Sequence, residues 1–63
     1  METNNTDIRI WAFQNNVRMY EIAEKLGIHY VTLSTKLRKE LNTEEKQKIF
    51  KIIDQIKQEK GGN

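Results

Sequence analysis

The scarcity of residues that interrupt helices is the feature of this sequence that most limits its fold. The chain of 63 residues has no proline and only three glycines, and two of these, Gly61 and Gly62, stand near its C-terminal end. Because proline and glycine most often mark turns and breaks in regular structure, their near absence favours helices joined by short connections. We therefore expect an all-α fold in one domain, since so short a chain has room for a single core.

Hydrophobic periodicity places four helices along the chain, at about residues 7–15, 19–26, 30–41 and 43–59. Asn15 and Asn16 are expected to end the first helix and Gly27 the second, because Asn and Gly tolerate the positive φ that a helix exit often requires. Asn42 and Glu45 have the spacing of a capping box, which is typical of a helix start.

The expected core extends over about residues 7–59. On the first helix, Ile8, Trp11 and Ala12 share one face, and Ile10 and Phe13 beside them are most simply core residues. The alternative is that Phe50 of the fourth helix, with Ile10 or Phe13, points outward and forms a dimer seam. The other core positions recur every third or fourth residue: Met19, Ile22, Ala23, Leu26, Leu33, Leu37, Leu41, Ile49, Ile52, Ile53 and Ile56. The polar ends, residues 1–6 and 60–63, are expected to be disordered.

Several classes of function are disfavoured by residues that the chain lacks. Without cysteine it has no disulfide, no thiolate zinc site and no thiol nucleophile. His29 is the only histidine, and with no nearby Asp, Glu or Cys it cannot build a metal site or a catalytic triad. We expect no enzyme, no cofactor and no small-molecule substrate.

Membrane association is not expected either. No apolar run approaches the length of a membrane span, and the N-terminal segment lacks the basic and apolar regions of a signal peptide. The sequence therefore favours a cytoplasmic protein.

The distribution of charge is more informative than its sum, which is only +2. From Lys25 to Lys39 the chain carries four positive residues, Lys25, Lys36, Arg38 and Lys39, and no Asp or Glu. A basic stretch without acidic residues indicates an anionic partner.

The segment from Met19 to Arg38 contains the most specific pattern. Two helices that cross steeply need a small residue where they touch, which Ala23 supplies, and a turn residue with positive φ, which Gly27 supplies four positions later. The apolar residues that fill the angle between the helices stand in register with these two: Ile22, Leu26, Ile28 and Leu33.

This pattern resembles the helix-turn-helix of the phage repressor and Cro-like (Xre-type) family. The matching residues run from Ile22 to Ile28 (Ile-Ala-Glu-Lys-Leu-Gly-Ile) and continue at Thr32-Leu33-Ser34, with Val17 at an apolar position ahead of the second helix. The resemblance covers about Ile8 to Leu41. It implies a small four-helix DNA-binding domain whose third helix enters the major groove.

Three positions differ from the family pattern. Arg18 replaces the usual Ser or Thr at the start of the second helix, and its side chain cannot accept a hydrogen bond there. His29 stands where a capping Ser is common, and Lys36 stands where an apolar residue is more frequent.

The resemblance also implies a set of DNA contacts. Residues at the start of the third helix and one turn later are expected to contact bases: Tyr30, Val31, Ser34, Thr35 and Arg38. Phosphate contacts are expected from basic or polar residues around them: Arg18, Tyr20, His29, Lys36 and Lys39. The alternatives are an ordinary solvated helix surface, a capping role for His29, and packing of the Tyr20 ring against the first helix.

Two functions remain open at this point. One is sequence-specific binding of double-stranded DNA by a small transcriptional regulator, which is monomeric in solution and pairs weakly, if at all, on a palindromic site. The other is a helical protein-interaction module, such as an adaptor or an antitoxin-like partner, that keeps the fold without binding DNA. The acid-free stretch favours DNA binding, and the low net charge favours the interaction module.

Overall fold

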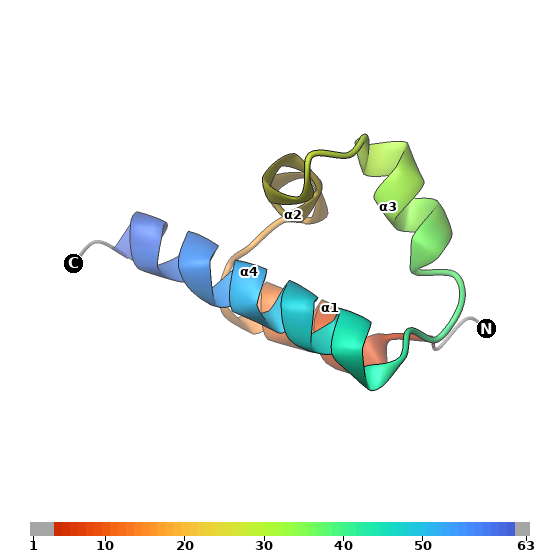
Figure 1. The fold of residues 1–63 in the computed structure, drawn as a ribbon. Helices are drawn as coiled ribbons and strands as arrows, with labels where there is room; N and C mark the ends of the chain where they lie inside the picture. Colours follow the sequence, from red (N-terminus) through yellow and green to blue (C-terminus); the bar gives the residue numbers. More distant parts are fainter. Residues whose placement is uncertain (1–3, 62–63) are drawn as a thin grey trace.

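The computed structural model describes residues 4–61, and this part of the chain folds into helices without a strand. The helices are α1 (Thr6–Gln14), α2 (Met19–Leu26), α3 (Tyr30–Lys36) and α4 (Thr43–Gly61). α1 and α4 lie side by side, and α2 and α3 stand together on one side of that pair (Figure 1). α2 packs on both α3 and α4. Within residues 4–61, no helix combines the length and the apolar surface that a membrane crossing requires.

All four helices contribute side chains to one buried cluster. Its members are at most 5% exposed: Ile8, Ala12, Val17, Ile22, Ala23, Leu33, Leu37, Ile49, Ile53 and Ile56. Half-buried apolar residues pack against its edge: Met19, Leu26, Ile28, Leu41, Phe50 and Ile52. The periodicity of α2 and α4 therefore predicted their inner faces correctly.

α2 ends as the sequence predicted. Gly27 has a φ of 75°, and the N–H of Ile28 donates to the carbonyl of Ala23 at 3.0 Å. This backward hydrogen bond across a residue with positive φ is the Schellman motif, which satisfies carbonyl groups at a helix end. The turn that follows leads directly into α3.

α1 ends in the same way. Asn16 has a φ of 59°, and the N–H of Val17 donates to the carbonyl of Ala12 at 2.8 Å. Asn tolerates this conformation better than most residues, so the sequence prediction that Asn16 ends α1 is confirmed.

The end of α3 differs from the prediction, which extended this helix to Leu41. α3 ends at Lys36, and Leu37 keeps its place in the core from the turn that follows. The cause is Asn5, whose fully buried side chain donates to the carbonyls of Leu37 (2.9 Å) and Lys39 (2.7 Å) and accepts from the N–H of Leu41 (3.0 Å). Because these backbone groups hydrogen-bond to Asn5, they are not available to continue the helix, and the chain turns away from the helix axis.

The ends of the described chain are more ordered than the sequence suggested. Asn5 is buried and Thr6 begins α1, so the expectation of disorder is wrong for this part of the N-terminal segment. Lys60 and Gly61 belong to α4, and the Lys60 ammonium donates to the carbonyl of Asn16 at 2.7 Å. Residues 1–3 and 62–63, also expected to be disordered, lie outside the described residues.

The assignment of Ile10 and Phe13 to the core is wrong, and the alternative, in which these residues point outward, agrees with their exposure. Phe13 is 85% exposed, Ile10 is 50% exposed, and Trp11 is 37% exposed with its indole N–H 3.4 Å from the Asp54 carboxylate. α1 packs on α4 with Ile8 and the adjacent face, and a helix with 3.6 residues per turn turns positions 10 and 13 away from that contact.

Candidate nucleic-acid interface

The start of α3 is fixed by His29. Its backbone is extended, with a ψ of 147°, and its Nδ1 accepts a hydrogen bond from the N–H of Val31 at 3.1 Å. This is an N-cap, so the capping role weighed from the sequence is confirmed. Because Nδ1 accepts, the neutral ring carries its proton on Nε2, which remains a donor.

One face of α3 is accessible along its whole length. Val31 is 59% exposed, and Tyr30, Thr32 and Thr35 are exposed with it, whereas Leu33 is buried against the core. The Thr35 hydroxyl donates to the carbonyl of Val31 at 3.0 Å, which leaves its oxygen lone pairs as acceptors. This face therefore presents an apolar group, hydroxyl oxygens and an aromatic ring.

Two of the predicted contact residues are placed differently from these. Ser34 is half-buried, so it is less accessible than Val31 and Thr35 on the same helix. Arg38 is exposed but lies beyond the end of α3, in the turn where its N–H donates to the carbonyl of Thr35 at 3.2 Å. Its own carbonyl accepts from the side chain of Asn4, so the N-terminal segment holds this turn in place.

The start of α2 carries Arg18 and Tyr20, both exposed. The N–H of Arg18 donates to the Glu21 carboxylate at 2.8 Å, and the Lys60 ammonium contacts the same carboxylate at 2.9 Å. These two interactions lower the pKa of Glu21, with the Arg18 N–H as the larger cause. Tyr20 is 61% exposed, so its ring is not buried against α1, and its hydroxyl is accessible.

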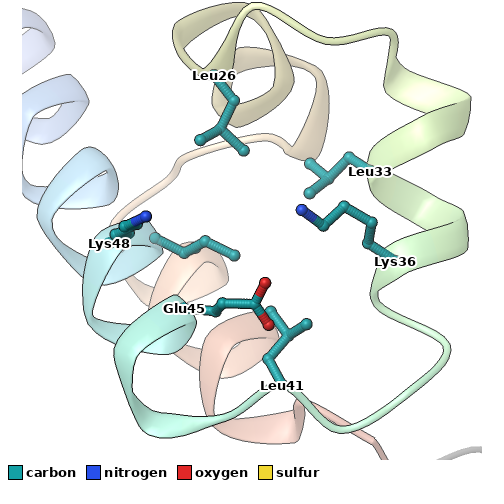
Figure 2. A pocket seen from close by; sticks show the side chains of 7 residues that line it. Leu26, Leu33, Lys36, Leu41, Glu45 and Lys48 are labelled. Carbon is teal, nitrogen blue, oxygen red and sulfur yellow. The ribbon is translucent and has the colours of Figure 1, made fainter.

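Lys36 lies on the side of α3 that faces α4. There it lines a pocket of about 150 Å³ whose apolar walls come from Leu26, Leu33, Leu41 and Ile49. Figure 2 shows the Lys36 side chain extending into the gap between the helices, with Glu45 opposite it. Lys48 of α4 lines the same pocket and adds a basic residue near α3 that is not among the contacts predicted from the sequence. The position of Lys48 within α4 does not indicate that it lies near α3, because the two helices are separate in the sequence and meet only in the folded structure.

The positive charges of the acid-free stretch are not equivalent. The Lys25 ammonium forms an ion pair with Glu59 at 2.7 Å, which offsets its charge. Among the described residues, no ion pair joins Lys36, Arg38 or Lys39 to a carboxylate. The uncompensated charge is therefore concentrated at the end of α3 and in the turn after it.

A second group of charges lies next to that turn. Lys46 contacts the carboxylates of Asp7 (3.0 Å) and Glu40, and Glu40 also accepts from the N–H of Asn5 at 2.7 Å. Hydrogen bonds to Lys46 are the main reason that the pKa of both carboxyl groups is lowered, and the two carboxylates raise the pKa of Lys46. The cluster ties the start of α1, the turn after α3 and the start of α4 together.

Residues 4–61 contain no group of three or more His, Asp or Glu side chains placed to hold a metal ion. Comparison of the chain with protein-family models, with curated protein sequences and with solved structures gave no match. The function of the α3 face has to be inferred from its own residues.

Proposed function

We propose that this protein is a small transcriptional regulator of the repressor and Cro-like type, which binds double-stranded DNA by placing α3 in the major groove. The observation that carries this proposal is the combination of packing and exposure at α3. α3 packs on α2, with Leu33 of α3 and Ala23 of α2 both buried in the shared core, while Val31 and Thr35 remain accessible. A seven-residue helix with one side packed and the other exposed suits the width of the major groove.

The residues of this face have suitable chemistry for base recognition. The Arg38 guanidinium can bridge O6 and N7 of guanine, the Thr35 hydroxyl oxygen can accept from an amino group, and the Val31 methyl groups can cover the methyl of thymine. Tyr30 lies at the start of the same face, and Ser34 contributes at its half-buried edge.

Phosphate contacts complete the proposed complex and fix its orientation. Lys39 beside the turn, the Nε2 donor of His29, and Arg18 with Tyr20 at the start of α2 are the proposed donors, and Lys36 joins them from the pocket side. A monomer with so few donors binds weakly at physiological salt, so stable occupancy requires pairing on two half-sites about one helical turn apart.

DNA binding is tested by titrating labelled random-sequence duplex at two salt concentrations, followed by selection of preferred sequences. We expect affinity to fall steeply with salt, because released counterions drive the binding.

Arg38→Ala should weaken binding to the selected site by about 1–3 kcal/mol and relax its base preference. Lys36→Glu with Lys39→Glu should weaken binding to all sequences alike, whereas Lys51→Glu with Lys57→Glu on α4 serves as a control matched for net charge. Unchanged affinity in all of these variants would contradict the proposal.

A protein-interaction module is the second candidate, and the exposed Ile10 and Phe13 on α1 favour it. Large accessible apolar residues more often mark a protein contact than a DNA contact. The two candidates are separable, because substitutions on α1 should affect only protein contacts and substitutions around α3 only DNA affinity.

A further inference from the structure

The most exposed large apolar residue of the described chain is Phe13, which is 85% exposed. Ile10, one turn earlier on α1, is 50% exposed and lies on the same side of the helix. The opposite side of α1 packs its Ile8 and Ala12 into the core. The Phe13 side chain is therefore almost wholly outside the core of one copy of the chain, and together with Ile10 it makes this side of α1 apolar.

A pocket lies directly beside Phe13, at the junction of α1 and α2. It has a volume of about 240 Å³ and is lined by Phe13, Asn16, Val17 and Arg18. The pocket lies at the Schellman turn, where Asn16 has a positive φ, the N–H of Val17 donates to the carbonyl of Ala12, and the Val17 side chain is buried. A cavity of about 150 Å³ is enough to bind benzene, so this pocket has room for one phenyl ring.

The walls of the pocket favour an aromatic guest. The Arg18 guanidinium can stack on a ring face, the ring of Phe13 can form an aromatic pair, and Val17 adds an apolar floor. Phe13 is thus both an aromatic residue that needs a partner and one wall of a pocket that fits such a residue. Two copies related by a two-fold axis satisfy both conditions at once, since the same patch meets itself.

We propose that this surface binds a second copy of the chain, with the Phe13 ring of each copy inserted into the α1–α2 pocket of the other. The proposal does not depend on DNA binding. A buried Phe side chain contributes about 150–250 Å², so two such rings with Ile10 at the margin bury less than the roughly 1,000 Å² of a stable interface. We expect a dissociation constant on the order of 0.1–1 mM, which keeps dilute protein monomeric.

Self-association is measured without DNA, by sedimentation equilibrium and by NMR chemical shifts between about 20 μM and 2 mM protein, a range chosen to span the expected dissociation constant. Phe13→Ala should weaken association at least about tenfold. It should leave the fold intact, because the side chain is almost fully exposed. Lys51→Ala is the control, an exposed residue of α4 that does not line the pocket and has no part in the proposed DNA contacts, and it should leave association unchanged.

Two further readouts identify the contact itself. In an equal mixture of ¹³C-labelled and unlabelled protein, isotope-filtered NOEs should connect the Phe13 ring of one copy with the Val17 methyl groups of the other. Raising the salt concentration should weaken the dimer much less than DNA binding, because the contacts of the Phe13 ring with Phe13 and Val17 are apolar and only its stacking on Arg18 is electrostatic. Spectra independent of concentration up to 2 mM, association that persists in Phe13→Ala, or filtered NOEs from another surface would each overturn the proposal.

Discussion

The two junctions on either side of α2 have the same backbone geometry and are held by different side chains. At the α1–α2 junction, Asn16 supplies the positive φ, and Glu21 accepts the N–H of Arg18, which has no side-chain cap of its own. At the α2–α3 junction, Gly27 supplies the positive φ, and His29 caps α3 with Nδ1. The same turn geometry is therefore formed by two different sets of residues. Asn or Gly can supply the positive φ, and the cap of the next helix can come from Glu21 or from His29.

The end of α3 lacks such a junction. The chain has no residue of positive φ there. Instead, the side chain of Asn5, near the N-terminus, hydrogen-bonds to backbone groups of Leu37, Lys39 and Leu41. Two helix ends in this protein are therefore determined locally and one at long range. Substitutions at Asn5, Gly27, Arg18 and His29 should therefore differ in their effect on stability.

The largest effect is expected for Asn5→Ala. This change leaves the carbonyls of Leu37 and Lys39 and the N–H of Leu41 without their partner, and a buried polar group without a partner costs about 1–3 kcal/mol. We expect the free energy of unfolding, measured by urea denaturation, to fall by about 2–3 kcal/mol in total. An effect below about 0.5 kcal/mol, the range of ordinary surface substitutions, would contradict the role given to Asn5.

The next effect concerns the residues with positive φ. Gly27→Ala should lower stability by about 1–2 kcal/mol through backbone strain alone, since a Cβ at this position meets no atom within 4 Å. Gly27→Asn makes the second junction like the first and should cost clearly less than Gly27→Ala. Thermal melts of the two variants decide this, and equal losses would show that the junctions are not equivalent.

A smaller effect is expected at the two caps. His29→Ala removes the acceptor for the N–H of Val31 and should cost about 1 kcal/mol. Arg18→Ser gives α2 the side-chain acceptor that it lacks and should raise stability by about 0.5–1 kcal/mol. Urea denaturation should show that the free energy of unfolding falls in His29→Ala and rises in Arg18→Ser. A loss of stability in Arg18→Ser would contradict this prediction.

The smallest effect is expected from pH. The pKa of Glu21 at the first junction, and those of Asp7 and Glu40 near the end of α3, are lowered in the folded state. A lowered pKa means that the stabilisation is present at neutral pH and is lost as the pH falls through about 4. Urea midpoints between pH 7 and pH 3 should therefore decrease, and Glu21→Gln should flatten part of this decrease. A steeper decrease in that variant would contradict the assignment.

The local junctions are the part of the fold that could be predicted from the sequence. Asn16 and Gly27 are recognisable because few residues adopt positive φ, and the apolar pattern of α2 and α4 identified their buried faces. The end of α3 could not be predicted, because Leu33, Leu37 and Leu41 fit a helical repeat and the competing partner, Asn5, lies more than thirty positions away in the sequence.

For the candidate site, the sequence predicts which types of side chain are present better than it predicts where they lie relative to one another. The sequence identifies the polar and basic residues of α3 but not that Ser34 is half-buried or that Lys36 and Lys48 share a pocket. Likewise, periodicity on α1 identifies apolar residues without revealing that α4 covers only one of their faces, so it leaves open whether Phe13 lies in the core or points outward. These properties depend on which helices meet, which no short stretch of sequence specifies.

The hydrogen bonds of Asn5 also order the events of folding. The α2–α3 pair has only local contacts to form, so it can assemble early, whereas the exit from α3 needs closure of a loop that joins residue 5 to residues 37–41. During synthesis, Asn5 leaves the ribosome long before its partners do. The last turn of the α3 region should therefore acquire its native shape only after residues 37–41 have left the ribosome, and it should be among the first parts to open when the N-terminal segment detaches.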